Sequence, residues 1–81
     1  MMKNEEILKQ TIFDVFFVEV ENIAEDFQKS EVSSWDSLGT VSLLNSLTKN
    51  FSIEIAPEEI LAVKSFSDIV ELLKTKGIRF E

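Results

Sequence analysis

Apolar side chains recur with a helical period in two long stretches of this 81-residue chain. In the first stretch, from Asn4 to about Val20, they fall on one stripe of a 3.6-residue period. The stripe consists of Leu8, Ile12, Val15 and Phe16, and Phe13 and Phe17 widen it. We expect a first helix that is buried along this side, although Val18 and Val20 would also suit a short extended piece.

The second helical stretch runs from Ser37 to Phe51, and Asn50 is a suitable residue to end it. Four of its residues are expected in the core: Leu43, Leu44, Leu47 and Phe51. A second strip of the same helix carries Leu38, Val41, Asn45 and Thr48. The connection from Glu21 to Asp36 has no sustained period, and a connection of this length is often functional. Four apolar residues should pin it over the helix ends: Ile23, Phe27, Val32 and Trp35.

The remainder of the chain predicts two further helices. Ser52 to Ala56 alternates isoleucine with polar residues, but a lone strand has no partner, so we expect an extended loop. Pro57 begins a short helix to about Val63, because proline and the glutamates that follow it suit a first helical turn. Ser65 to Asp68 resembles a capping box and begins a fourth helix, which Gly77 ends. These elements predict a single all-α domain over residues 1–81, a four-helix bundle with a long first loop and a short third helix.

The composition of the chain excludes several classes of function. The chain has no cysteine and no histidine, which removes disulfides, thiolate metal sites and the commonest general base. No calcium-binding loop motif is present, and no two acids stand in an evident apolar pocket, so we expect neither a metal site nor an enzyme. The net charge of −7 disfavours nucleic acid as a partner. No apolar run is long enough for a membrane span, and we expect a cytoplasmic monomer.

Trp35, Asp36, Ser37 and Leu38 stand where the long loop meets the second helix. Here the chain resembles the acyl carrier protein family, whose attachment motif is Asp-Ser-Leu at the start of the second helix. The likeness extends through Gly39, Thr40 and Val41 and the leucines that follow, then through Ile53-Glu54-Ile55 and Pro57-Glu58-Glu59-Ile60. It is strong from Trp35 to about Leu73.

The resemblance implies a role for each matching residue. Ser37 would carry 4′-phosphopantetheine, delivered from coenzyme A by a separate phosphopantetheinyl transferase, and the cargo would be a thioester on its thiol. Asp36 and Leu38 would be the cofactor-binding residues on either side of Ser37, and Asp36 would help that transferase dock. The surface that acyl-loading and acyl-using enzymes touch would include Leu38, Val41, Asn45, Thr48 and Glu58. The resemblance would also place the chain in fatty acid or polyketide biosynthesis.

Physical chemistry agrees with this placement of Ser37, because the unpaired N–H groups at a helix N-terminus favour an attached phosphate. A carrier also needs no nucleophile of its own, since the cofactor supplies the thiol. Asp and Ser are, however, preferred helix caps without any further function. The phenylalanines at 13, 16, 17, 51 and 66 are most simply core residues. Some of them, with Ile60, Leu61 and Ala62, could border an opening between the second and third helices.

The charge pattern departs from that of the fatty-acid carriers, whose second helix carries several acids. Ser37 to Asn50 has none, whereas Lys3 to Phe27 holds seven acids and two lysines, a net charge of −5. Since rim charges mainly set partner choice and association rate, this predicts a specialised carrier that serves a dedicated enzyme. Two other functions stay open: an aminoacyl carrier of the D-alanyl or peptidyl kind, and a helical interaction module that is never modified.

Overall fold

A computed structural model describes residues 3–19, 21, 23 and 28–80, with only the backbone of Glu31. The described part contains four α-helices and one 3₁₀ turn: α1 (Asn4–Phe16), η2 (Lys29–Glu31), α2 (Ser37–Phe51), α3 (Pro57–Leu61) and α4 (Phe66–Thr75). Within these residues the only β pairing is an isolated bridge between Gln28 and Ser65. The predicted all-α fold, with a long first loop and a short third helix, is therefore confirmed.

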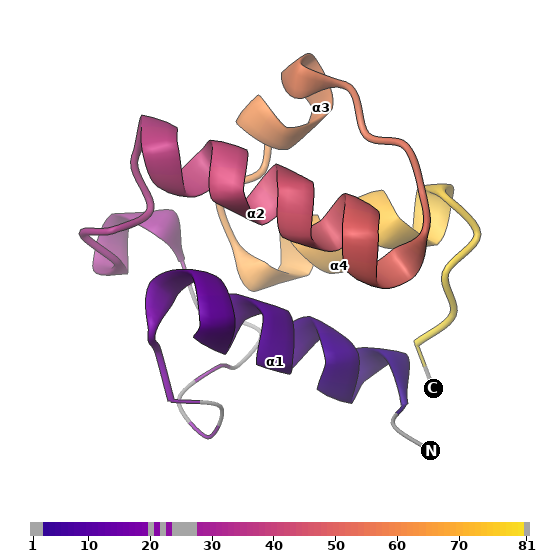
Figure 1. The fold of residues 1–81 in the computed structure, drawn as a ribbon, viewed down its shortest axis with the longest axis horizontal. Helices are drawn as coiled ribbons and strands as arrows, with labels where there is room; N and C mark the ends of the chain where they lie inside the picture. Colours follow the sequence, from indigo (N-terminus) through magenta and orange to yellow (C-terminus); the bar gives the residue numbers. More distant parts are fainter. Residues whose placement is uncertain (1–2, 20, 22, 24–27, 81) are drawn as a thin grey trace.

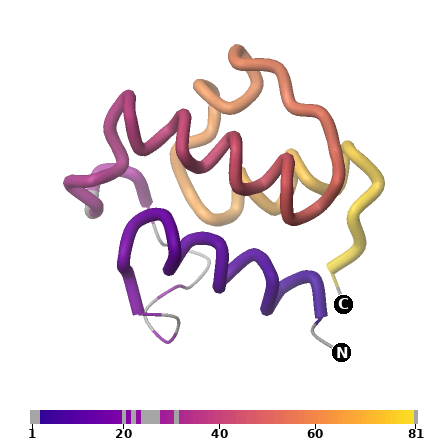
Figure 2. Tube along the Cα trace, in the orientation of Figure 1, coloured from indigo at the N-terminus to yellow at the C-terminus, as the bar shows by residue number. Residues whose placement is uncertain are grey.

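The four helices form a compact body of 29 × 28 × 19 Å. Helix α1 lies along α2 and runs in the opposite direction, α3 lies on the far side of α2, and α4 passes behind (Figure 1). The described ends of the chain meet at one end of the molecule (Figure 2). There the Asn4 side-chain amide donates to the carbonyl oxygen of Arg79 over 2.9 Å. The start of α2 lies at the opposite end (Figure 1).

A single core receives side chains from every α-helix and from the long loop. Its buried apolar members are Leu8, Ile12, Phe16, Ile23, Val32, Trp35, Leu43, Leu47, Ile60, Val63, Phe66, Ile69 and Leu73. Ile23, Val32 and Trp35 pin the loop as predicted, and the Trp35 ring stacks on Phe16 with 5.1 Å between ring centroids. Phe27 lies outside the described residues. The loop also contains the turn η2, which the sequence pattern did not predict.

Helix α1 ends at Phe16, four residues before the predicted end near Val20. Phe17 adopts the left-handed conformation, with φ 59°, and its N–H bonds back to the carbonyl oxygen of Phe13 over 2.7 Å. This turn takes the Phe17 side chain out of the apolar stripe. It is 80% exposed, so its prediction as a core residue was wrong.

The later boundaries differ less from prediction. Helix α2 has the predicted bounds, but Asn50 does not end it: Ser52 does, with φ 53°. Asn50 instead donates to the hydroxyl of Thr11 over 2.7 Å and thereby links α2 to α1. Helix α3 ends at Leu61 and not near Val63, which is buried. In the segment from Ser52 to Ala56, which was expected to be an extended loop, Ser52 is left-handed, and residues 53–56 belong to neither a helix nor a strand. None of the helices in the described segments is long and apolar enough to cross a membrane.

Candidate functional site

The junction of the long loop with α2 is built around Asp36. This residue is the N-cap of α2, and its Oδ1 accepts a hydrogen bond of 2.9 Å from the Gly39 N–H. Its own carbonyl oxygen accepts from the Thr40 N–H over 2.8 Å, which begins the helical bonding. Ser37 is the first residue of the helix, and its side chain is exposed. The cap therefore holds the Ser37 hydroxyl in solvent, beside the positive end of a 15-residue helix.

The structure explains why position 39 is a glycine, which the sequence alone does not. A β-carbon at this position would overlap the carbonyl oxygen of Ser34 and would come within 2.9 Å of Phe16 Cε1. The loop backbone thus packs directly against the first turn of α2. Trp35 of the loop also stacks on Phe16 of α1. The position of Ser37, two residues after Trp35, is therefore fixed by the loop as well as by the helix.

Apolar side chains remain exposed on α2 and α3. Leu38 is 79% exposed and Val41 54%, one helical turn apart on α2. Sequence reasoning placed both on a surface strip and is correct about their exposure. Leu61 at the end of α3 is 62% exposed, although it was expected beside an opening between helices. Leu61 is the last residue of α3, and its neighbour Ile60 is the one that is buried in the core.

The other predicted surface residues lie further along α2 and on α3. Asn45 is exposed, and Thr48 is half-buried with its hydroxyl donating to the Leu44 carbonyl oxygen over 2.8 Å. Both line an open recess of about 550 Å³ between α2 and α3. Glu58 is exposed in the first turn of α3 and does not line this recess. Ile60, Leu61 and Ala62 do not line it either, contrary to expectation: Ile60 points into the core, and the other two are exposed.

An ion pair joins α3 to the end of α4 beside this recess. Glu59 Oε1 accepts from the Ala56 N–H and from Lys76 Nζ, each over 2.9 Å. The Ala56 hydrogen bond, and then Lys76, hold the pKa of the Glu59 carboxyl below its ordinary value of 4.5. This carboxylate both caps α3 and ties it to α4.

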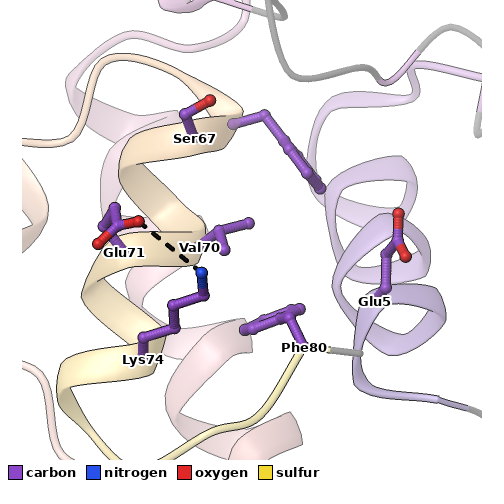
Figure 3. Close-up of a pocket in the computed structure, with 7 residues that line it drawn as sticks. Glu5, Ser67, Val70, Glu71, Lys74 and Phe80 are labelled. Atoms are coloured by element: carbon purple, nitrogen blue, oxygen red, sulfur yellow. Dashed lines mark ion pairs between the residues drawn. The ribbon is translucent and has the colours of Figure 1, made fainter.

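A second recess, of about 360 Å³, lies between α1 and α4. Figure 3 shows Val70 and Phe80 facing Glu5 across it. Lys74 and Glu71 form an exposed ion pair of 3.9 Å on its rim, of the kind that contributes little to stability. Glu5 belongs to the start of α1, so this recess lies at the end of the molecule opposite Ser37 (Figure 1). Among the described residues, no three side chains of metal-binding type gather to hold an ion.

Comparison with known proteins matches residues 33–73 to the family described as "Phosphopantetheine attachment site". The chain is 32% identical over 79 residues to the acyl carrier protein of Buchnera aphidicola subsp. Acyrthosiphon pisum (strain 5A), covering 96% of this chain and 99% of the relative. It is 33% identical over 70 residues to the acyl carrier protein of Akkermansia muciniphila, covering 86% and 88%. It is also 39% identical over 55 residues to an acyl carrier protein homolog of Mycoplasmopsis pulmonis, covering 68% and 74%.

Proposed function

Because this chain belongs to the acyl carrier protein family, we propose that Ser37 is the residue to which its cofactor is attached. The cofactor is 4′-phosphopantetheine, held covalently. When bound, it supplies a terminal thiol on which an acyl group is carried as a thioester. A phosphopantetheinyl transferase and acyl-handling enzymes are the partners that family membership implies.

The exposure of Ser37 at the first position of α2 is the observation that supports this proposal. Its Oγ would attack the phosphorus that bears the pantetheine arm of coenzyme A and form the phosphodiester as the pyrophosphate P–O bond breaks. Adenosine 3′,5′-bisphosphate would leave, and the hydroxyl proton would pass to a base on the transferase. The N–H groups of a first helical turn have no acceptor within the helix, so they favour the attached phosphate. The nearest carboxylate in sequence, Asp36, is already bonded to the Gly39 N–H. The residues present therefore fit the group.

Other residues of the chain would position and present the arm. Asp36 caps α2 and would form part of the surface on which the transferase docks. Leu38 and Val41, both exposed, would be the apolar contacts of a docked enzyme, with Leu61 adding a third on α3. We regard residues 1–81 as one carrier domain, since all four α-helices share one core. With neither histidine nor cysteine, we infer that the chain serves its partner enzymes and catalyses nothing itself.

We further propose that the carrier serves a specialised biosynthetic pathway. No acid occurs from Ser37 to Ile53, and Lys49 gives this segment a charge of +1. A partner enzyme whose docking site is a basic patch would find no complementary charge on α2. A partner with an apolar and uncharged docking site would suit Leu38, Val41 and the exposed Asn45.

Intact mass spectrometry tests the attachment site. The purified chain is incubated with coenzyme A, Mg²⁺ and a broad-specificity phosphopantetheinyl transferase. We expect the wild type to gain the mass of one phosphopantetheine group and Ser37→Ala to gain nothing.

Ser34→Ala is the matched control, because Ser34 is an exposed serine three positions earlier in the chain. It should be modified like the wild type. Circular dichroism confirms that each variant is folded. A folded wild-type chain whose mass stays unchanged, or a Ser37→Ala variant that is still modified, would contradict the proposal.

A further inference from the structure

Phe17 combines two features that are unfavourable at a surface position. Its side chain is 80% exposed, and its backbone is left-handed, with φ 59° and ψ 32°. Glycine most often ends a helix in this conformation, because a β-carbon is unfavourable there. An exposed aromatic ring at such a position does not pack in the core, and its β-carbon makes the left-handed backbone less favourable. The stability of the fold therefore does not explain why position 17 is a phenylalanine.

Three acidic residues lie within four positions of Phe17 in the sequence. Asp14 lies in the last turn of α1, and Glu19 and Glu21 follow Phe17; all three are exposed. Asp14 accepts a hydrogen bond of 3.2 Å from Gln10 Nε2. Across the described segments, the ion pairs involve other carboxylates. An exposed ring with exposed acids close to it in the chain is complementary to an apolar pocket whose rim carries Lys and Arg side chains.

Phe17 also lies at the same end of the molecule as Ser37. Its neighbour Phe16 stacks on Trp35, which comes two residues before Ser37. Phe16 also reaches the first turn of α2 at Gly39. Figure 1 shows the end of α1 and the start of α2 at one end of the bundle. An enzyme that reaches an arm on Ser37 therefore has Phe17 within the range of a protein interface.

We propose that Phe17 anchors a protein partner, its ring entering an apolar pocket rimmed by Lys and Arg on an enzyme that acts on the thioester cargo. The inference rests on the proposed carrier role, because it places the pocket on a cargo enzyme. In this arrangement the acids at and after the end of α1, and not residues of α2, make the electrostatic contact with the partner's Lys and Arg side chains. A second copy of the chain is a poorer fit, since its acids would face those of the first, and an anionic membrane would repel them as well.

Photo-crosslinking from position 17 tests this surface. Phe17 is replaced by p-benzoylphenylalanine in the full chain, which is expressed in the host that encodes it, and cross-linked products are identified by mass spectrometry. We expect one cargo enzyme to be captured from position 17 and not from the exposed position 75 on α4. The cross-linked peptide should belong to an apolar pocket bordered by basic residues.

Binding to the captured, purified enzyme then provides the quantitative readout. Phe17→Gly should weaken binding by about tenfold or more, the loss typical of a truncated aromatic anchor. Ser52→Gly is the matched control, because Ser52 is the other described non-glycine residue with positive φ, at 53°. It should bind like the wild type. Neither glycine variant should unfold at lower urea concentration, which separates lost binding from lost folding. Neutralising Asp14, Glu19 and Glu21 together should weaken binding and reduce its dependence on salt.

Four results would overturn the inference: capture of a second copy, of a lipid or of a protein that does not act on the cargo; no capture from position 17; equal capture from position 75; or unchanged binding by Phe17→Gly. The mass of the chain in the same samples distinguishes the two proposals. A modified chain with no capture from position 17 overturns this inference alone. An unmodified chain overturns the carrier role and this inference with it.

Discussion

At the scale of single residues, the loop and the helix start constrain each other at Gly39. Glycine within a helix is disfavoured by about 1 kcal/mol relative to alanine, yet here the carbonyl of Ser34 occupies the space that a β-carbon needs. This contact brings the loop backbone close to the residue that carries the exposed hydroxyl. The loss of helix propensity is therefore linked to the placement of Ser37.

Gly39→Ala should consequently destabilise the protein by about 1–3 kcal/mol, as overpacking does. Helix propensity alone predicts the opposite sign, so the measurement separates the two effects. Urea unfolding followed by circular dichroism gives the free energy of unfolding. Ser42→Ala, at an exposed position of the same helix, is the control and should change stability little. A Gly39→Ala protein as stable as the wild type would show that Ser34 moves away freely.

At the scale of elements, the short helix α3 depends on Glu59. A five-residue helix has little intrinsic stability, and here one carboxylate accepts from the helix start and from Lys76 at the end of α4. Ile60 adds the buried contact. Leu61 is the last residue of α3, so the contacts of Glu59 and Ile60 that hold this helix also set the position of the exposed Leu61.

Acidification should expose this dependence. The folded-state pKa of Glu59 lies below its ordinary value of 4.5, first because of the Ala56 N–H and then because of Lys76. Its contribution is therefore complete above about pH 4.5 and is lost as pH falls through the folded-state pKa. Between neutral pH and about pH 3, Glu59→Gln should lose less stability than the wild type. Glu71→Gln, which alters the exposed 3.9 Å pair, should behave like the wild type. Equal pH dependence in all three proteins would contradict the anchoring role.

The sequence predicts elements well where local chemistry decides them. The bounds of α2 follow from the Asp36 cap and a regular apolar stripe, and both are features of adjacent residues. The end of α1 could not be predicted, because Phe17 and Val18 continue the apolar pattern. The residue with positive φ is a phenylalanine and not the glycine or asparagine that usually marks a helix end. The need for glycine at position 39 could not be predicted from the sequence either, because only the folded loop brings the Ser34 carbonyl against it.

In the candidate site, too, some features follow from the local sequence and others depend on packing between elements. The exposure of Ser37, Leu38 and Val41 was predictable, because they start a helix and lie off its apolar stripe. The exposure of Phe17 and Leu61 was not predictable from the pattern in which they stand. Both depend on where a helix stops, and that is decided by packing between elements.

At the scale of the whole molecule, the distribution of charge is the property that selects partners. The net charge of −7 would attract basic surfaces in general. The first turns of α2, however, present Leu38, Val41 and Ser42 to solvent without any acid. Association with an enzyme that recognises acids on α2 should therefore be slow, although the chain as a whole is acidic.

Adding one acid to α2 tests this separation of local from total charge. The modified wild type should be loaded by a fatty-acid malonyl transferase more slowly than a housekeeping carrier, and Asn45→Glu should recover part of the difference. Asn45 is exposed on the strip that continues from Leu38 and Val41, so its carboxylate would meet the basic patch of the transferase. The gain should appear in kcat/KM and shrink as salt is added, because it arises from steering. Thr75→Glu adds the same charge at an exposed position on α4 and should leave the rate unchanged. Equal acceleration by both variants would mean that total charge, and not its place on α2, limits the encounter.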